Sequence, residues 1–188
     1  MMLNDINIIL IGFMGSGKTS VGNRLSGQTG YRFIDIDAEI EANTGESIPH
    51  IFTTYGESYF RSLESGVLRK VCLVKRAVIA TGGGVIKQSG NAEVLRRSGL
   101  VFYLRWPAED LYGHVKGSTN RPLLYVPEPL DEIKKLLSER EPLYLSTAHI
   151  VIECAGKSIA SIADETETRY IKETEAHHIE ELGGNSRG

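Results

Sequence analysis

The stretch from Asn7 to Thr19, NIILIGFMGSGKT, decides how the rest of the chain is interpreted. It opens with Asn7–Ile11, a short and mostly apolar run before a glycine, which is typical of a parallel strand buried on both faces. Residues 12–19 then match the pattern G-x-x-x-x-G-K-[ST] at every fixed position. A helical pattern follows over Lys18–Thr29. Strand, loop and helix therefore stand in the order that a phosphate-binding loop requires.

This loop predicts a binding site for a nucleoside triphosphate. Its glycines let backbone N–H groups converge on phosphate oxygens, and the helix behind them adds its positive end. We expect Lys18 to reach the β- and γ-phosphates and to act in catalysis, and Thr19 to place its hydroxyl on Mg²⁺. The predicted nucleotide-binding residues of the loop are Gly12, Gly15, Ser16, Gly17, Lys18 and Thr19. The plainer alternative is a glycine-rich turn with an exposed lysine, and neither interpretation names the acceptor.

Apolar runs alternate with segments of helical period along the rest of the chain. The further candidate strands are residues 31–34, 77–81, 100–104 and 149–153. The candidate helices are residues 18–29, 38–43, 47–55, 57–73, 91–98 and 158–182, a segment begun by Pro107, and a segment around 130–137 that Pro142 should end or kink. This alternation predicts an α/β fold with right-handed βαβ units. We expect one domain over residues 1–182, with a five-stranded parallel sheet flanked by helices on both faces, and a disordered tail over residues 183–188.

Residues 113–129, GHVKGSTNRPLLYVPEP, break the helical pattern on both sides. The segment is rich in Gly, Pro, Ser and Asn. A long loop inside a compact domain is usually functional or disordered. We therefore expect a mobile lid at this position.

The overall composition excludes several classes of protein. The 188 residues are 41% hydrophobic and 24% charged with a formal net charge of −3, as in a soluble domain without a general attraction to nucleic acid or anionic membranes. No apolar run approaches the roughly 20 residues of a membrane-spanning helix, and the first residues lack the features of a signal peptide. Cys72 and Cys154 are expected to be reduced, buried thiols. These features predict a cytoplasmic protein that binds anions through a local cluster of basic residues.

Five further motifs follow the phosphate loop. They are Asp35-Ile36-Asp37, Phe60-Arg61-x-x-Glu64, Gly82-Gly83-Gly84, Arg121-Pro122-Leu123-Leu124 and Arg140-x-x-x-Tyr144. In this order and spacing around one phosphate loop, the chain resembles the shikimate kinases from about Ile6 to Ile152. The resemblance implies a P-loop kinase fold and a monomeric enzyme. Such an enzyme uses ATP and Mg²⁺ to phosphorylate the 3-hydroxyl of shikimate, a step toward chorismate and the aromatic amino acids.

The two aspartates are assigned to the metal and to the acceptor. Asp35 and Asp37 follow an apolar strand, so alternation along the extended chain turns both side chains the same way, beside the phosphate loop. The resemblance implies that Asp35 contacts Mg²⁺ through water. It implies that Asp37 is catalytic and binds the acceptor hydroxyls, as a base or as a positioning residue. The alternative is that Asp37 only caps the next helix.

The resemblance also assigns the arginines. Arg61 and Arg140 are implied to clamp the substrate carboxylate, with Glu64 orienting Arg61, because a guanidinium presents two parallel donors. Gly83 is implied to donate its backbone N–H to the substrate. Arg121 is implied to carry a positive charge from the lid to the nucleotide and the transferring phosphoryl group. Without the resemblance, Arg61 is only an i,i+3 partner of Glu64. Arg140 is then a helix-end residue and Arg121 an exposed loop residue.

Two features depart from the family pattern at the adenine end. The arginine expected shortly before the lid is missing from residues 113–116, GHVK, so its role is unfilled or passes to His114 or Lys116. The loop expected to contact adenine after the last strand is degenerate and reads AGKS at residues 155–158. Two other functions stay open at this point: another small P-loop kinase, for gluconate or a nucleoside monophosphate, and a non-catalytic nucleotide-binding module.

Overall fold

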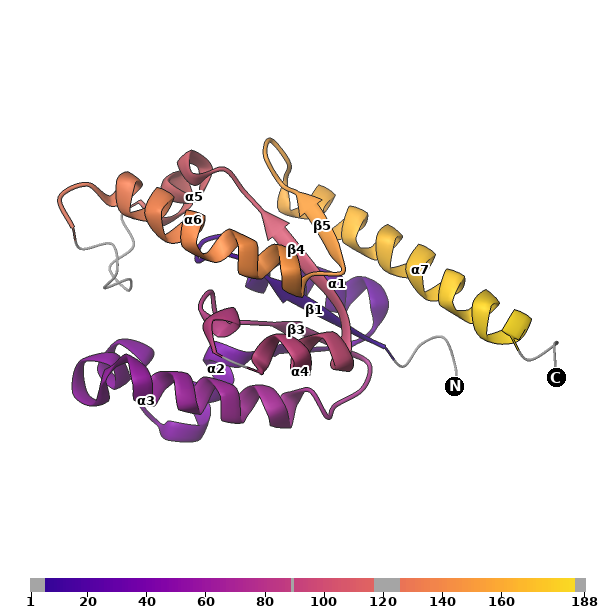
Figure 1. Cartoon of the computed structure of the whole chain (residues 1–188), viewed down its shortest axis with the longest axis horizontal. Helices are drawn as coiled ribbons and strands as arrows, with labels where there is room; N and C mark the ends of the chain where they lie inside the picture. Colours follow the sequence, from indigo (N-terminus) through magenta and orange to yellow (C-terminus); the bar gives the residue numbers. More distant parts are fainter. Residues whose placement is uncertain (1–5, 89, 117–125, 185–188) are drawn as a thin grey trace.

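Five parallel strands form one sheet at the centre of the molecule (Figure 1). The computed structural model describes residues 6–88, 90–116 and 126–184, with side chains described as far as Ala176. The strands are β1 (Asn7–Ile11), β2 (Arg32–Asp35), β3 (Ala77–Ala80), β4 (Gly99–Arg105) and β5 (Ile150–Glu153). Their order is β2-β3-β1-β4-β5, and every neighbouring pair is parallel. The predicted α/β fold is confirmed, and each predicted strand agrees to within one residue at either end.

Helices cover both faces of this sheet. They are α1 (Lys18–Thr29), α2 (Ile36–Thr44), α3 (Ile48–Val71), α4 (Asn91–Ser98), α5 (Ala108–Val115), α6 (Pro129–Thr147) and α7 (Ile159–Gly184), with one 3-10 turn, η1 (Val85–Lys87). The central strand, β1, shows why both faces need a layer of helices. Ile8 and Leu10 belong to one buried cluster, and Ile9 and Ile11 belong to another. Successive side chains of a strand point to opposite faces, so an apolar strand needs a cover on both.

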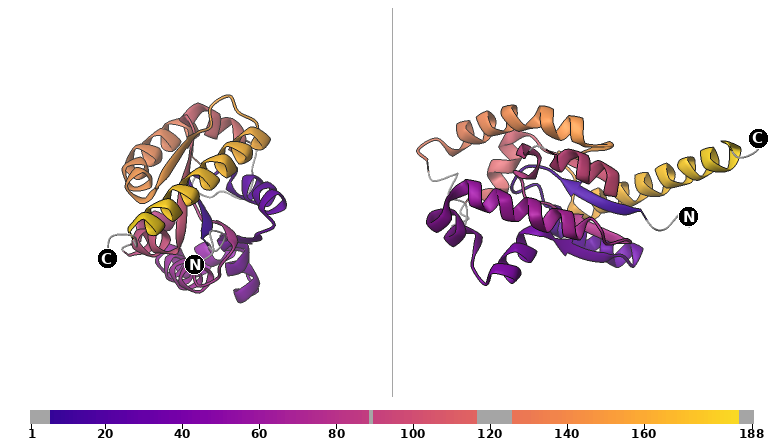
Figure 2. Two further views of the ribbon diagram at one scale, coloured as in Figure 1. Left: turned by 90° about the vertical axis from the view of Figure 1, so that its right-hand side faces the viewer. Right: turned by 60° about the horizontal axis from the view of Figure 1, so that its bottom comes forward.

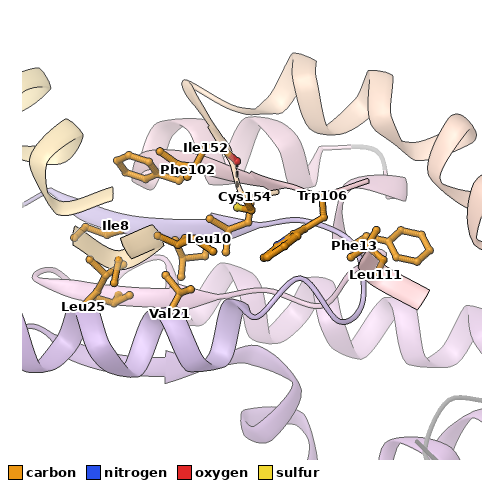
Figure 3. Close-up of a cluster of buried hydrophobic side chains, with 14 of the residues drawn as sticks. Ile8, Leu10, Phe13, Val21, Leu25, Phe102, Trp106, Leu111, Ile152 and Cys154 are labelled. Atoms are coloured by element: carbon orange, nitrogen blue, oxygen red, sulfur yellow. Dashed lines mark hydrogen bonds between the residues drawn. The ribbon is translucent and has the colours of Figure 1, made fainter. Parts of the chain in front are cut away.

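The first cluster packs the sheet against α1, α5 and α7. Figure 3 shows Ile8 and Leu10 of β1 close to Val21 and Leu25 of α1. Trp106 continues this cluster toward the phosphate loop. The second cluster packs the opposite face against α2, α3 and α4. Its members on these three helices are Ile36, Ile40, Ile51, Phe60, Leu68, Val71 and Leu95, and Tyr144 of α6 joins them.

Two helices depart most from the prediction. The predicted helices 47–55 and 57–73 form one element, α3, with a kink at Gly56, where φ is 82°. Pro142 was predicted to end or kink its helix, and the first of these alternatives is wrong, since α6 runs on to Thr147. Tyr144 and Thr147 are almost completely buried, so tertiary packing holds the last turn of α6 in place despite the proline.

The last helix, α7, packs along α1 and projects past the body of the protein (Figure 2). It includes residues 183 and 184, which were predicted to belong to a disordered tail, and residues 185–188 lie outside the described part of the chain. Within the predicted lid, residues 113–115 complete α5 and Pro129 begins α6, while residues 117–125 lie outside the described ranges. No helix among the described residues is long and apolar enough to cross a membrane.

The side chain of Asn7 joins three backbone segments at the amino end of the sheet. Its Nδ2 donates to the carbonyls of Val74 and Ser98 at 2.7 and 3.1 Å, and its Oδ1 accepts from the N–H of Ala77 at 3.0 Å. Asn7 has no exposed surface. Because buried backbone groups must find partners, this single amide stabilises the ends of three segments.

Replacing Asn7 by alanine should lower the free energy of unfolding by about 2–4 kcal/mol, because three buried backbone groups lose their partner. Denaturant unfolding followed by circular dichroism measures the change. The exposed hydrogen bond between Gln28 and Asp164 provides a control. Gln28→Ala should change the same free energy by less than about 0.5 kcal/mol. Equal effects of the two substitutions would contradict the role given to Asn7.

Candidate active site

The carboxyl ends of β1, β2 and β3 border a cavity of about 320 Å³. Ligands of open parallel sheets bind at this end of the strands, where the strand order reverses. The cavity is lined by the phosphate loop, the end of β2 and the turn after β3. These lining residues are Met14, Gly15, Gly17, Lys18, Thr19, Ser20, Asp35, Asp37, Thr81 and Gly83. Of the predicted residues, Gly15, Gly17, Lys18 and Thr19 of the phosphate loop, both aspartates and Gly83 therefore border one space, whereas Gly12 and Ser16 do not line it.

The phosphate loop between β1 and α1 folds around the ammonium group of Lys18. Its Nζ donates to the carbonyls of Gly12 and Phe13 at 2.8 and 2.9 Å. Lys18 is only 8% exposed, which excludes the interpretation of the motif as a turn with an exposed lysine. Gly15 and Gly17 have φ values of 79° and 82°, a left-handed conformation that favours glycine. The loop thus places a cation and the first turn of α1 beside the cavity.

Thr19 and Asp35 lie in contact where α1 and α2 begin. Thr19 Oγ1 donates to Asp35 Oδ2 at 2.7 Å. The other carboxylate oxygen of Asp35 accepts from the backbone N–H groups of Asp37 and Ala38 at 3.0 and 3.4 Å, so Asp35 caps α2. The alternative that Asp37 caps this helix is therefore wrong.

This pair of oxygen ligands suits a magnesium ion. A hydroxyl and a carboxylate are the hard donors that Mg²⁺ prefers. The described residues hold no group of three or more His, Cys, Asp or Glu side chains that would bind a metal by themselves. The donor set thus fits an ion shared with the phosphates of a nucleotide, as Mg²⁺ commonly is.

Asp37 and Glu64 each bury one carboxylate oxygen beside Gly82. Asp37 Oδ1 and Glu64 Oε1 have no hydrogen-bond partner among the described residues. A Cβ on Gly82 would lie 2.9 Å from Asp37 Oδ1 and would overlap Glu64 Oε1, so a side chain here would displace these carboxylates. Burial raises the pKa of Asp37, the charge of Asp35 adds to this rise, and two nearby cations oppose it. An unpaired acceptor beside a cavity is suited to a hydroxyl donor of a ligand.

Arg61 is buried on α3, with 6% of its surface exposed. Its Nη1 donates to Glu64 Oε2 at 2.6 Å and its Nε to Glu57 Oε1 at 3.2 Å. Its guanidinium lies 5.0 Å from the centroid of the Phe60 ring. Burial disfavours the charged guanidinium, but Glu64 and Glu57 outweigh this effect and raise the pKa of Arg61. The expected pairing with Glu64 is present, whereas Glu57 is a partner that was not predicted, although its i,i+4 spacing is a usable signal.

Arg140 and Tyr144 extend from α6 toward the same region. Arg140 is 4% exposed, and its guanidinium lies 5.4 Å from the centroid of the Phe13 ring in the phosphate loop. The Tyr144 hydroxyl donates to the carbonyl of Gly83. Burial raises the pKa of Tyr144, and the charges of Arg140 and Arg61 oppose that rise. A Cβ on Gly84 would overlap the Arg61 guanidinium, so Arg61 of α3 and Tyr144 of α6 both contact the turn after β3.

The adenine end is less complete than the phosphate and acceptor regions. Arg121 lies outside the described residues. His114 is exposed at the end of α5, and its Nδ1 lies 3.0 Å from the carbonyl oxygen of Gly15. Lys157 forms an ion pair with Glu165 at 2.6 Å. Neither His114 nor Lys157 is among the residues that line the cavity.

Proteins of similar sequence place this arrangement in one family. A family profile described as "Shikimate kinase" matches residues 14–172. The chain belongs to the shikimate kinase family. The shikimate kinase of Thermodesulfovibrio yellowstonii is 42% identical over 164 residues, which cover 87% of this chain and 94% of that relative. That of Nitrosococcus oceani is 43% identical over 164 residues, covering 87% of this chain and 86% of the relative.

Solved structures of shikimate kinases share the fold. A shikimate kinase from Acinetobacter baumannii, in complex with shikimate, has a TM-score of 0.87 and 40% identity, and the match covers 89% of this chain and 94% of the other. A gluconokinase from Sinorhizobium meliloti, with a TM-score of 0.57 and 16% identity, shares the fold alone. The resemblance inferred from the motifs is confirmed, and this member of the shikimate kinase family is a P-loop kinase.

Replacing Asp37 by asparagine should stabilise the protein at neutral pH by about 0.5–2 kcal/mol, because the substitution removes a buried charge with an unpaired oxygen. Since folding raises the pKa of Asp37, the parent loses stability as the pH rises from the unfolded pKa through the folded pKa. The difference between the two proteins should therefore disappear at low pH, where the carboxyl is protonated in both states. Thermal unfolding of both proteins across this pH range measures it, and a parent more stable than the variant at neutral pH would contradict the assignment.

Proposed function

We propose that this chain transfers the γ-phosphoryl group of ATP to the 3-hydroxyl of shikimate, producing shikimate 3-phosphate on the route to chorismate and the aromatic amino acids. The observation that carries the proposal is the convergence of buried Arg61 and Arg140 beside a phosphate loop. Buried cations are costly unless an anion joins them, and a carboxylate matches the guanidinium fork. Similarity to a shikimate kinase solved with shikimate supports this choice of acceptor.

The substrate carboxylate binds between Arg61 and Arg140. Glu64 and Glu57 hold two nitrogens of the Arg61 guanidinium, so its other donors keep a defined direction. The backbone N–H of Gly83 adds a third donor to the substrate. The hydrogen bond from Tyr144 to the carbonyl of Gly83 supports this turn from the side of α6.

Asp37 aligns the 3-hydroxyl with the γ-phosphorus and accepts its proton. Its Oδ1 is buried and without a partner among the described residues, and its raised pKa makes it a stronger base than an exposed carboxylate. Lys18 contacts the β- and γ-phosphates and neutralises charge that develops in the transition state. Because phosphoryl transfer needs little covalent chemistry from the protein, positioning and electrostatics supply most of the rate.

Thr19 and Asp35 would hold Mg²⁺. Thr19 would bind the ion through its hydroxyl, and Asp35, which accepts a hydrogen bond from Thr19, would bind it through water. When bound, the ion supplies positive charge to the β- and γ-phosphate oxygens. The loop residues that bind the phosphates with Lys18 and Thr19 are Gly12, Gly15, Ser16 and Gly17.

Arg121 adds a further positive charge over the nucleotide. It belongs to the segment between α5 and α6, which we propose to be a lid whose closure would exclude water and so suppress hydrolysis of ATP. We place the enzyme in the cytoplasm as a monomer that binds ATP and shikimate, without a nucleic acid or membrane partner. The formal net charge of −3 supports the absence of a nucleic acid or membrane partner, because nucleic acids and anionic membranes do not attract a protein of negative net charge.

A coupled assay of ADP release with a panel of acceptors tests this function. We expect turnover with shikimate, and none above background with gluconate or nucleoside monophosphates. Asp37→Asn should lower kcat by about 100-fold or more and leave ADP binding unchanged, since it removes the base but not the phosphate loop. Absence of turnover with shikimate in the parent protein would refute the proposal, and turnover with a nucleoside monophosphate instead would identify the rival kinase.

Replacing Arg140 by lysine should raise the KM for shikimate about 10-fold or more, because lysine keeps the charge but loses the fork that grips a carboxylate. The KM for ATP should stay within about twofold of the parent value. Arg97→Lys is the matched control, since Arg97 is exposed and paired only with Glu93 on α4. If KM for ATP rose as much as KM for shikimate, Arg140 would not belong to the acceptor site.

A further inference from the structure

Two aromatic side chains hold the phosphate loop from the side of α5. His114 Nδ1 lies 3.0 Å from the carbonyl oxygen of Gly15, and the indole Nε1 of Trp106 donates to the carbonyl of Ser16 at 3.1 Å. The two rings pack edge to face with their centroids 4.7 Å apart. Neither ring lines the cavity. They therefore contact the loop without standing where the phosphates would bind.

The two contacts fall on consecutive peptide units. A carbonyl oxygen can only accept, so the bond to Gly15 requires the proton of His114 to be on Nδ1. In a trans peptide unit the C=O and the N–H point in opposite directions, and the described chain has no cis peptide bond. Fixing the two carbonyls thus also fixes the N–H groups of Ser16 and Gly17.

One of these N–H groups closes the loop, and the other belongs to a residue that lines the cavity. The N–H of Ser16 donates to the carbonyl of Phe13 at 3.2 Å, and the same carbonyl accepts from Lys18. The N–H of Gly17 points away from Trp106, and Gly17 lines the cavity. By holding the two carbonyls, His114 and Trp106 therefore also restrict the Phe13 carbonyl that accepts from Lys18 and the Gly17 N–H that can donate to phosphate.

The helix that carries His114 is itself firmly packed. A Cβ on Gly15 would run into Val115 Cγ1 and would also lie 3.7 Å from the carbonyl oxygen of Leu111. Val115 and Leu111 are 4% and 1% exposed. Leu111 and Val115 thus anchor the last turn of α5 in the core, while His114 is exposed.

We propose that His114 and Trp106 are positioning residues that preorganise the phosphate loop for its nucleotide. A glycine-rich loop has more conformational freedom to lose on binding than other backbone, and holding its peptides in place beforehand lowers that cost. His114 thereby acts through the backbone on the phosphates, and not by contact with the adenine base. The inference rests on the proposed ATP site and adds two residues to it.

Calorimetric titration with Mg-ADP and with inorganic tripolyphosphate separates these two roles of His114. His114→Ala should weaken binding of both ligands by the same factor, about 2- to 10-fold, because one hydrogen bond to the loop is lost. His114→Asn should restore both affinities, since its amide nitrogen stands at the same number of bonds from the backbone as Nδ1. His114→Gln should not restore the affinities, because its amide nitrogen stands one bond further from the backbone. The KM for shikimate should stay unchanged in all three variants.

Three results would overturn the proposal. Weaker binding of ADP with unchanged binding of tripolyphosphate would assign His114 to the base. Equal losses of affinity in the alanine and asparagine variants would show that the hydrogen-bond donor is irrelevant. Unchanged binding in the alanine variant would show that the contact between His114 and Gly15 is irrelevant. Trp106→Phe, which keeps a ring and removes the donor, should repeat the pattern of His114→Ala. Failure of the parent protein to bind either ligand would instead refute the proposed ATP site.

Discussion

Lys18 donates from its buried ammonium group to the carbonyls of Gly12 and Phe13, and the rest of the site is arranged around this contact. The contact closes the phosphate loop between β1 and α1. It has a rigid base, because β1 is the central strand of the sheet and is buried on both faces. The aspartates after β2 and the glycine turn after β3 reach the same cavity because parallel strands end at one edge.

Burial of charge distinguishes the acceptor side of this site. Arg61, Glu64 and Arg140 have little or no exposed surface, and Asp37 buries an oxygen without a partner among the described residues. Such groups destabilise a folded chain unless they compensate one another. Glu64 compensates Arg61 in part, at 2.6 Å, while one oxygen of Glu64 and one of Asp37 stay unpaired. A ligand that carries both a carboxylate and hydroxyls would complete this set of charges and donors.

The phosphate loop depends on its backbone groups and on the side chains that pack against it. The loop carries its ligand-binding groups on peptide N–H donors, so its precision depends on what holds those peptides. Lys18 holds two carbonyls from inside the loop, and Trp106 and His114 hold two more from the side of α5. α5 ends shortly before the segment that we propose to be a lid.

The sequence by itself determined the fold class, the five strands and the phosphate loop, because these depend on local patterns: alternation of apolar runs and helical periods, and glycines at fixed spacing. It also indicated the acceptor residues, through motifs whose order resembles one family. Only the tertiary structure decided that Asp35 and not Asp37 caps α2, and that α6 continues past Pro142. It likewise placed Arg61 against Gly84, set the Tyr144 hydroxyl on the carbonyl of Gly83, and set His114 against the loop. These outcomes depend on contacts between distant segments, and no local pattern specifies which carboxylate meets an N–H or which buried ring holds a turn.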